Sequence, residues 1–207
     1  MDDMATFASR DYFLLLLLLA FARGMDFLST WIATPNLVLE GNPLAKKLGW
    51  RWGLLLNVVL VGVLAMWPLS AIVVATASVL VAARNFQSAW LMHSLGEENY
   101  RRWYVERVQE TRITLYLLCL AGNTLLTAGV GAVLIYSSHL RLECPFAIGM
   151  GMVAYAVAVA FYTLLASWRI RRAAKKLEAR QNGSAAGKAF MTEPWARAEN
   201  RAPDKII

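Results

Sequence analysis

The sequence predicts an all-α protein, a polytopic membrane bundle of about five transmembrane helices, and two observations carry this prediction. Hydrophobic residues make up 58% of the 207 residues, and the mean hydropathy is +0.45, which is above the range of ordinary soluble domains. The apolar residues also gather in stretches of about 20, the length that a helix needs to cross a hydrocarbon core of roughly 30 Å. The expected spans are about 12–33, 52–69, 70–93, 112–137 and 146–168.

The first span is expected to be a retained helix and not a cleaved signal peptide. Its segment Ala20-Phe21-Ala22 resembles a small-x-small cleavage site. However, the residues before the apolar run include Asp2, Asp3 and Asp11, whereas a signal peptide is positively charged there. We therefore expect this segment to cross the membrane.

Positive charges in the short loops predict the orientation. Lys46, Lys47 and Arg51 lie between spans one and two, four arginines lie between spans three and four, and five basic residues follow span five. The opposite side has only Arg10 and Arg141. Because cytoplasmic loops carry the excess of Lys and Arg, the amino terminus is expected outside and the carboxyl terminus in the cytoplasm.

The loop between spans three and four is expected to contain an amphipathic helix, at about 95–111, that lies on the cytoplasmic membrane surface. Ser94-Leu95-Gly96-Glu97 has the form of a capping box at its start. Tyr100, Trp103 and Tyr104 then share one face, where their rings would lie at headgroup depth. A helix docked on a soluble partner is the alternative.

The bundle is expected to occupy residues 1–181, with a basic cluster after span five. This cluster is expected to meet anionic headgroups at the membrane surface. Its members are Arg169, Arg171, Arg172, Lys175 and Lys176. Residues 182–207 are rich in Gly, Ser, Ala and Pro with mixed charge, which predicts a flexible cytoplasmic tail.

Polar residues inside the first span predict a site within the membrane. Arg23, Asp26 and Thr30 lie at i, i+3 and i+7 and so share one helical face. A charged side chain that faces lipid at the centre of a span costs about 2.5 to 3.5 kcal/mol, so this face is expected to point into the bundle. The third span repeats the feature, because Arg84, Gln87 and Ser88 share one helical face there. Arg84 also falls at a depth comparable to that of Arg23.

These residues predict one polar cluster on the cytoplasmic half of the bundle, with Asp26 paired to an arginine of either span. Its expected members are Arg23, Asp26, Thr30, Glu40, Asn42, Asn57, Arg84, Asn85, Gln87 and Ser88. The cluster either fixes the register of the helices or forms a ligand or catalytic site. The pattern does not decide between these roles.

Neither a metal site nor a cofactor is expected. Cys119 and Cys144 are not spaced as metal ligands or as a disulfide framework, and His93 and His139 fall on opposite sides of the membrane, which argues against a haem that uses both. The sequence has no HExxH, GxSxG or Gly-rich phosphate loop, so the catalytic residues stay unknown. The net charge of +7 follows from the loop charges, so nucleic-acid binding is not expected.

The segment Asp26-x-x-Ser29-Thr30, followed by a short loop and Glu40-x-Asn42-Pro43, resembles a family of small, uncharacterised prokaryotic integral membrane proteins. The resemblance covers about residues 20–60. It implies a membrane fold with Asp26 and Glu40 in one site. The expected location of the five-span bundle is the prokaryotic cytoplasmic (inner) membrane. No reaction comes with it.

Three functions follow from this sequence. The first is an accessory or interaction subunit of a membrane assembly that binds a protein partner or another copy. Small residues such as Ala71 and Ala75 in span three and Ala154 and Ala158 in span five favour close helix packing, either inside the bundle or with such a partner. The second is a carrier or binding protein for an anionic substrate or lipid headgroup. The third is an intramembrane enzyme that uses Asp26 and Glu40.

Overall fold

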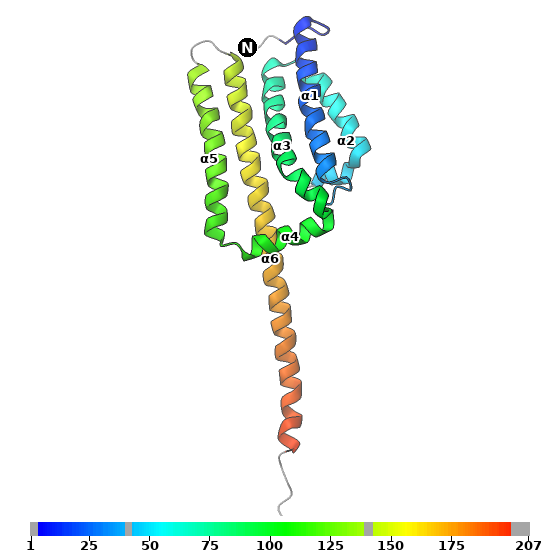
Figure 1. Cartoon of the computed structure of the whole chain (residues 1–207), viewed down its shortest axis with the longest axis vertical. Helices are drawn as coiled ribbons and strands as arrows, with labels where there is room; N and C mark the ends of the chain where they lie inside the picture. Colours follow the sequence, from blue (N-terminus) through cyan, green and yellow to red (C-terminus); the bar gives the residue numbers. More distant parts are fainter. Residues whose placement is uncertain (1–3, 40–42, 139–142, 200–207) are drawn as a thin grey trace, which may run out of the picture. The chain divides into compact units, whose positions relative to one another are not determined.

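The structure, a computed structural model, describes a helical chain in residues 4–39, 43–138 and 143–199, apart from the side chains of 43–45, 143 and 177–199. The described residues contain no strand. The helices are α1 (Arg10–Ala33), α2 (Pro43–Leu64), α3 (Pro68–Leu95), α4 (Glu97–Glu110), α5 (Ile113–Ser137) and α6 (Glu143–Glu199) (Figure 1).

Five segments are long and apolar enough to cross a membrane, which confirms the predicted all-helical fold with about five membrane-length apolar helices. They are Arg10–Ala33, Lys46–Leu64, Pro68–Leu95, Ile113–Ser137 and Cys144–Lys176. The short α4 connects α3 to α5, where the amphipathic helix is predicted. Its position at a membrane surface and the orientation of the chain stay predictions.

The second and third spans meet earlier in the chain than the hydropathy predicts. Helix α2 ends at Leu64, and α3 begins at Pro68, where the fixed φ of proline suits the first helical position and its missing N–H costs no hydrogen bond. The turn between the helices carries hydrogen bonds from the N–H of Met66 to the carbonyl of Val63 (3.2 Å) and from Trp67 to Leu64 (3.0 Å).

Helix α2 is broken near its start. Gly49 has φ 65° and ψ −176°, a conformation that a residue with a Cβ rarely adopts. Trp50, the next residue, donates from Nε1 to the carbonyl of Pro35 (2.8 Å) and packs edge-on against Phe27, with ring centroids 5.0 Å apart. The break therefore joins the start of the second span to the loop that follows α1.

Helices α1 and α3 pack along one another through small side chains. On α3 the buried residues are Ala71, Ala75, Ser78, Ala82 and Ala89, which recur on one side of the helix. This places the predicted Ala71 and Ala75 stripe inside the bundle. Small side chains let two membrane helices approach closely, so that polar side chains of one helix can form hydrogen bonds to the other.

Helices α5 and α6 approach one another at two glycines. A Cβ on Gly149 would lie 2.5 Å from the carbonyl oxygen of Gly131, so neither helix has room for a larger residue at this crossing. Further along α6, Ala156 is buried. The predicted stripe of Ala154 and Ala158 is exposed, because the opposite side of α6 is the one that packs.

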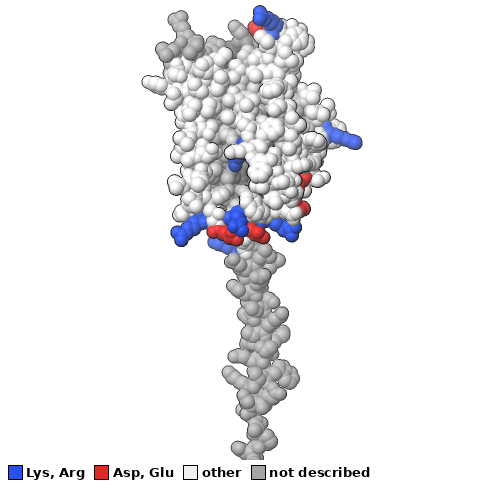
Figure 2. All heavy atoms as spheres, in the orientation of Figure 1, with Lys and Arg blue, Asp and Glu red and all other residues white. Residues whose placement is uncertain are grey.

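The chain divides into two compact units, Met1–Ala166 and Ser167–Ile207. In the first unit the charged side chains gather mostly at the ends of the helices, and basic atoms also appear in a hollow of the mostly white wall (Figure 2). In the second unit α6 continues to Glu199. The flexibility of the tail at 182–207 stays a prediction.

Candidate functional site

The centre of the first unit contains a polar cluster built around the guanidinium of Arg23. Its Nε donates to Oδ1 of Asn57 (2.8 Å), and Nη2 donates to the same oxygen. Its Nη1 donates to Oδ2 of Asp26 (2.8 Å) and to Oγ of Ser78 (3.3 Å). The side chains of Arg23 and Asp26 are 29% and 18% exposed. One cation thus connects α1, α2 and α3.

The partners of Arg23 are themselves held in place. The amide Nδ2 of Asn57 donates to the carbonyl of Gly53 (2.8 Å), which turns the amide oxygen towards the guanidinium. Because Asp26 supplies one negative charge beside one positive charge, the cluster needs no external anion for neutrality. A cation and an anion held together in this way are tolerated inside a membrane.

A second set of hydrogen bonds joins α1 to α3 one turn further along. The hydroxyl of Ser29, which is fully buried, donates to the carbonyl of Asp26 (2.9 Å). The amide of Asn85 donates to Oγ of Ser29 (3.4 Å) and to Oγ1 of Thr30 (3.3 Å). The structure therefore brings Arg23, Asp26, Thr30, Asn57 and Asn85 into one continuous region, to which Ser29 and Ser78 also contribute.

The structure does not bring Arg84 or Gln87 into this region, although both are predicted members of the cluster. Both side chains are exposed, and among the described residues neither has a hydrogen bond from its side chain. Within the described ranges, Ser88 donates to carbonyls of its own helix, those of Arg84 (3.5 Å) and Asn85 (3.3 Å). The reason is geometric: Asn85 lies on the side of α3 that packs on α1, and Arg84 is turned about 100° away.

Glu40 and Asn42, the remaining predicted members, lie outside the described residues. The expected pairing of Asp26 with Glu40 therefore stays a prediction. The described part of the site has its acid, Asp26, in an ion pair with Arg23.

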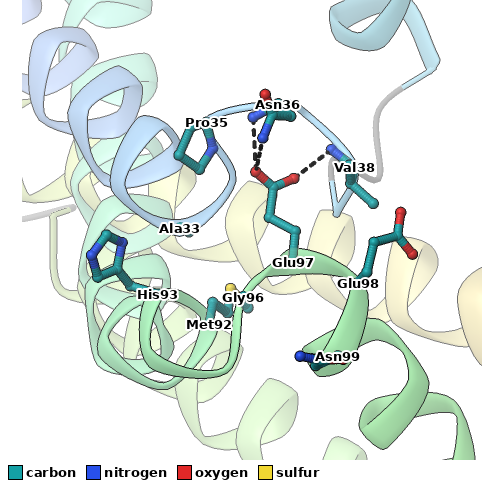
Figure 3. Close-up of a pocket in the computed structure, with 10 residues that line it drawn as sticks. All are labelled: Ala33, Pro35, Asn36, Val38, Met92, His93, Gly96, Glu97, Glu98 and Asn99. Carbon is teal, nitrogen blue, oxygen red and sulfur yellow. Dashed lines mark hydrogen bonds between the residues drawn. The ribbon is translucent and has the colours of Figure 1, made fainter.

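Glu97, at the start of α4, forms a polar contact that its sequence pattern does not predict. Its carboxylate accepts hydrogen bonds from the backbone N–H (2.8 Å) and Nδ2 (3.1 Å) of Asn36 and from the N–H of Val38 (3.0 Å) (Figure 3). It also accepts a hydrogen bond from Oγ1 of Thr34 (2.9 Å). These donors belong to the loop after α1. Glu97 therefore fastens that loop to the junction of α3 and α4.

The hydrogen bonds also govern the charge of Glu97. Partial burial raises the pKa of its carboxyl, but the bonds from Asn36, Thr34 and Val38 together outweigh burial and leave the pKa below its ordinary value.

The predicted capping box at Ser94 is wrong, because Ser94 lies inside α3 and donates to the carbonyl of Leu91 (3.1 Å). The φ of 75° at Gly96 instead turns the chain and aims Glu97 at the loop.

An open cavity of about 410 Å³ lies beside Glu97. Its walls come from the end of α1, the following loop, the end of α3 and the start of α4, and they include His93, Glu98 and Asn99 (Figure 3). With Glu97 already bonded to the loop and Glu98 beside it, the cavity offers acidic and amide groups and would repel an anion.

The predicted membrane-surface residues lie on α4 and α6. The hydroxyl of Tyr104 on α4 lies 3.4 Å from the hydroxyl of Tyr116 on α5. Val108 of α4 is buried, and Tyr100 packs near Trp103 with ring centroids 5.6 Å apart. Burial, with Tyr104 nearby, raises the pKa of Tyr100. The side of α4 that carries these rings therefore contacts the protein in part, while Trp103 is 41% exposed.

On α6 the basic cluster is mostly at the surface. Arg169, Arg172, Lys175 and Lys176 are exposed, and Arg171 is half-buried. The guanidinium of Arg172 lies 4.9 Å from the ring centre of Trp168, within the range of a cation–π contact. Contact of these residues with lipid headgroups stays a prediction.

Comparison with protein-family models, with curated proteins and with solved structures finds no match to this chain. The resemblance over residues 20–60 therefore stays an expectation from the sequence. The features that bear on function are the Arg23 cluster, the Glu97 contact and the exposed side of α3.

Proposed function

We propose that this chain is a multi-pass protein of the prokaryotic cytoplasmic membrane, with its amino terminus outside, and that it acts there as an accessory or interaction subunit of a membrane assembly. The observation that carries the proposal is the exposure of Arg84 and Gln87 on α3, inside a segment long enough to span the membrane. Polar side chains exposed to lipid at this depth are costly. A protein partner that covers them removes that cost.

The arrangement around Arg23 supports the same proposal. A site that receives an anion needs a cation whose donors are available, whereas three donor nitrogens of Arg23 are bonded to Asp26, Asn57 and Ser78. This cluster is well suited to holding α1, α2 and α3 in register. In this proposal it is a structural lock, and recognition takes place on the outside of the bundle.

In this orientation α4 lies on the cytoplasmic surface, and the basic residues of α6 meet anionic headgroups. Arg101, Arg102 and Arg107 on α4 are exposed, and each cation near an anionic surface contributes about 1 kcal/mol. Lipids are therefore expected partners in addition to protein.

A carrier or binding protein for an anionic substrate or lipid headgroup is the second candidate. The exposed guanidinium of Arg84 favours it, because arginine donates two parallel hydrogen bonds to a carboxylate or phosphate. The catalytic alternative depends on Glu40, which lies outside the described residues, so the described site adds no support for it.

Native mass spectrometry of the protein, released gently from its own membrane, separates these candidates. We expect a stoichiometric complex with a larger, identifiable membrane protein. A protomer or homodimer that carries only a defined anion or lipid would contradict the proposed function and favour the second candidate. Where Arg84→Leu is compared with the wild-type chain, Arg112→Leu is the matched control for general loss of positive charge, because it removes an exposed cation just before α5.

A further inference from the structure

One side of α3 is exposed along the second half of the helix. We call this surface the Arg84 face, and it consists of Val79, Ala83, Arg84, Gln87 and Trp90. All five side chains are exposed, with Val79 at 44% and Trp90 at 69%. The face combines apolar side chains, a small residue that permits close approach, and two polar groups, which is the composition of a helix-packing surface in membranes.

The neighbouring α6 covers this side of α3 only near its start. A Cβ on Gly151 would lie 2.7 Å from both the carbonyl oxygen of Val73 and Cβ of Thr76. Arg84 follows Val73 by eleven residues, about three turns, and so points to nearly the same side. On α6, Tyr162 follows Gly151 by eleven residues as well, and it is 48% exposed. The two helices run in the same direction (Figure 1), and their contact no longer covers α3 at this level.

The depth of Arg84 restricts what can cover it. Helix α3 has 28 residues and is therefore about 42 Å long, against roughly 30 Å of hydrocarbon. Leu95 follows Arg84 by about 16 Å of helix, so in a centred span the Cα of Arg84 lies about 10 Å inside the nearer boundary. The Cα–Cβ bond also tilts towards the helix amino terminus, away from that boundary. A lipid phosphate is poorly placed to reach it.

A second copy of the chain does not fit this face. A two-fold contact across it would bring two Arg84 side chains together, and like charges repel strongly at low dielectric. In the described spans the acids are Asp11 and Asp26. Asp11 lies in the first turn of α1, far from the depth of Arg84, and Asp26 is paired with Arg23.

From these observations we infer that the Arg84 face binds a membrane-spanning helix of a different protein, and that this helix carries a carboxylate near the middle of its span. The carboxylate accepts hydrogen bonds from Arg84, Gln87 lies one turn away as a second donor, and Ala83 allows the backbones to approach. This inference rests on the proposed function and specifies the chemistry of the partner.

The test uses three designed peptides in vesicles of phosphatidylcholine that contain the full chain. Each peptide is a Leu/Ala helix of about 20 residues, with Glu, Gln or Leu at its central position, and association is followed by energy transfer from a fluorophore on the peptide. We expect the Glu peptide to bind about five- to thirty-fold more tightly than the Leu peptide, which corresponds to 1–2 kcal/mol for a polar contact between membrane helices. The Gln peptide should fall between them.

Variants of the chain assign the effect to one side chain. Arg84→Leu should abolish the preference for Glu, Arg84→Lys should retain part of it, and Arg112→Leu should retain all of it. Equal binding of the three peptides, or a preference that survives Arg84→Leu, would overturn the inference. So would competition by phosphatidylglycerol that depends on Arg84, because it would assign the face to a lipid phosphate.

Native complexes separate this inference from the proposed function. If the natural partner stays stoichiometric on Arg84→Leu, the Arg84 face is not the contact, although the subunit role stands. If the wild-type chain has no protein partner, the proposed function itself fails. A partner that is lost on Arg84→Leu and kept on Arg112→Leu supports both.

Discussion

Arg23 lies inside the bundle with its guanidinium bonded to Asp26, Asn57 and Ser78, whereas Arg84 on α3 is exposed. Both arginines lie near the middle of a span. The difference comes from the neighbouring helices: α1 is enclosed by α2 and α3 at this level, whereas the side of α3 that carries Arg84 is open. A charge within a span is thus either part of the fold or part of a surface for another molecule.

The largest effect is expected where the enclosed arginine is removed. Arg23→Leu removes the cation of the ion pair with Asp26 and two donors to Asn57. The free energy of unfolding should therefore fall by about 2 to 4 kcal/mol, somewhat less than for a fully buried pair. Reversible unfolding in lipid, followed by a probe of helix separation between α1 and α2, measures it.

A double-mutant cycle tests whether the loss comes from the ion pair. Asp26→Asn should also destabilise the bundle, and the double variant Arg23→Leu/Asp26→Asn should lose less than the sum of the two single losses. Strict additivity would show that Arg23 and Asp26 do not act together, and the contrast with Arg84 would lose its basis.

A smaller effect is expected where α6 closes the same side of α3 above Arg84. Gly151→Ala places a Cβ 2.7 Å from the backbone oxygen of Val73, so the helices must separate, at a cost of about 1 to 3 kcal/mol. Gly122→Ala is the matched control, because a Cβ there meets nothing within 4 Å. If both variants unfold at the wild-type stability, α6 does not pack on α3 at Val73 and the open side of α3 is longer than described.

Glu97 offers a polar contact outside the spans for comparison with the Arg23 cluster. Glu97→Gln removes the charge and turns an amide donor towards the donors of the loop, so the backbone N–H groups of Asn36 and Val38 should exchange with solvent about tenfold faster. Hydrogen exchange read by mass spectrometry detects this, and Glu98→Gln, at an exposed neighbour, should leave the loop unchanged. Similar exchange rates in both variants would argue that the loop is held by other contacts.

The same contact should depend on pH. The pKa of Glu97 lies below its ordinary value of 4.5 in the folded chain, so its stabilisation of the loop is complete above that value and is lost as the pH falls through the folded-state pKa. Loop exchange in wild type, corrected for the intrinsic pH dependence of amide exchange, should therefore rise only under acidic conditions. Glu97→Gln should show no such rise.

The helices were predictable because hydropathy and periodicity are local properties of the sequence. The contacts between helices were harder to predict because the contacting residues lie far apart in the sequence. Hydropathy located five spans, and helical periodicity placed Arg23, Asp26 and Thr30 on one face. Periodicity also placed Arg84 and Gln87 together, but it cannot tell which side of α3 a neighbouring helix covers. That depends on small residues such as Ala82 and Ala89, whose packing against α1 is a property of two helices.

Glu97 shows the same limit more sharply. In sequence it completes a capping box, a local motif, whereas its partners Thr34, Asn36 and Val38 precede it by about sixty residues. Gly96 was the sequence signal for the contact with the loop. A glycine at this position permits the positive φ that ends α3 and turns the carboxylate of Glu97 towards the loop after α1.

The smallest effect on stability is expected at Arg84, and it is the sharpest test of the comparison. In the described part of the chain the guanidinium of Arg84 has no hydrogen bond to lose, and leucine is favourable in lipid where arginine is costly. Arg84→Leu should therefore unfold within about 0.5 kcal/mol of wild type or be more stable, in the same assay that shows the large loss for Arg23→Leu. A loss as large as that of Arg23→Leu would mean that Arg84 also holds the bundle together, and α3 would then have no free polar face to offer a partner.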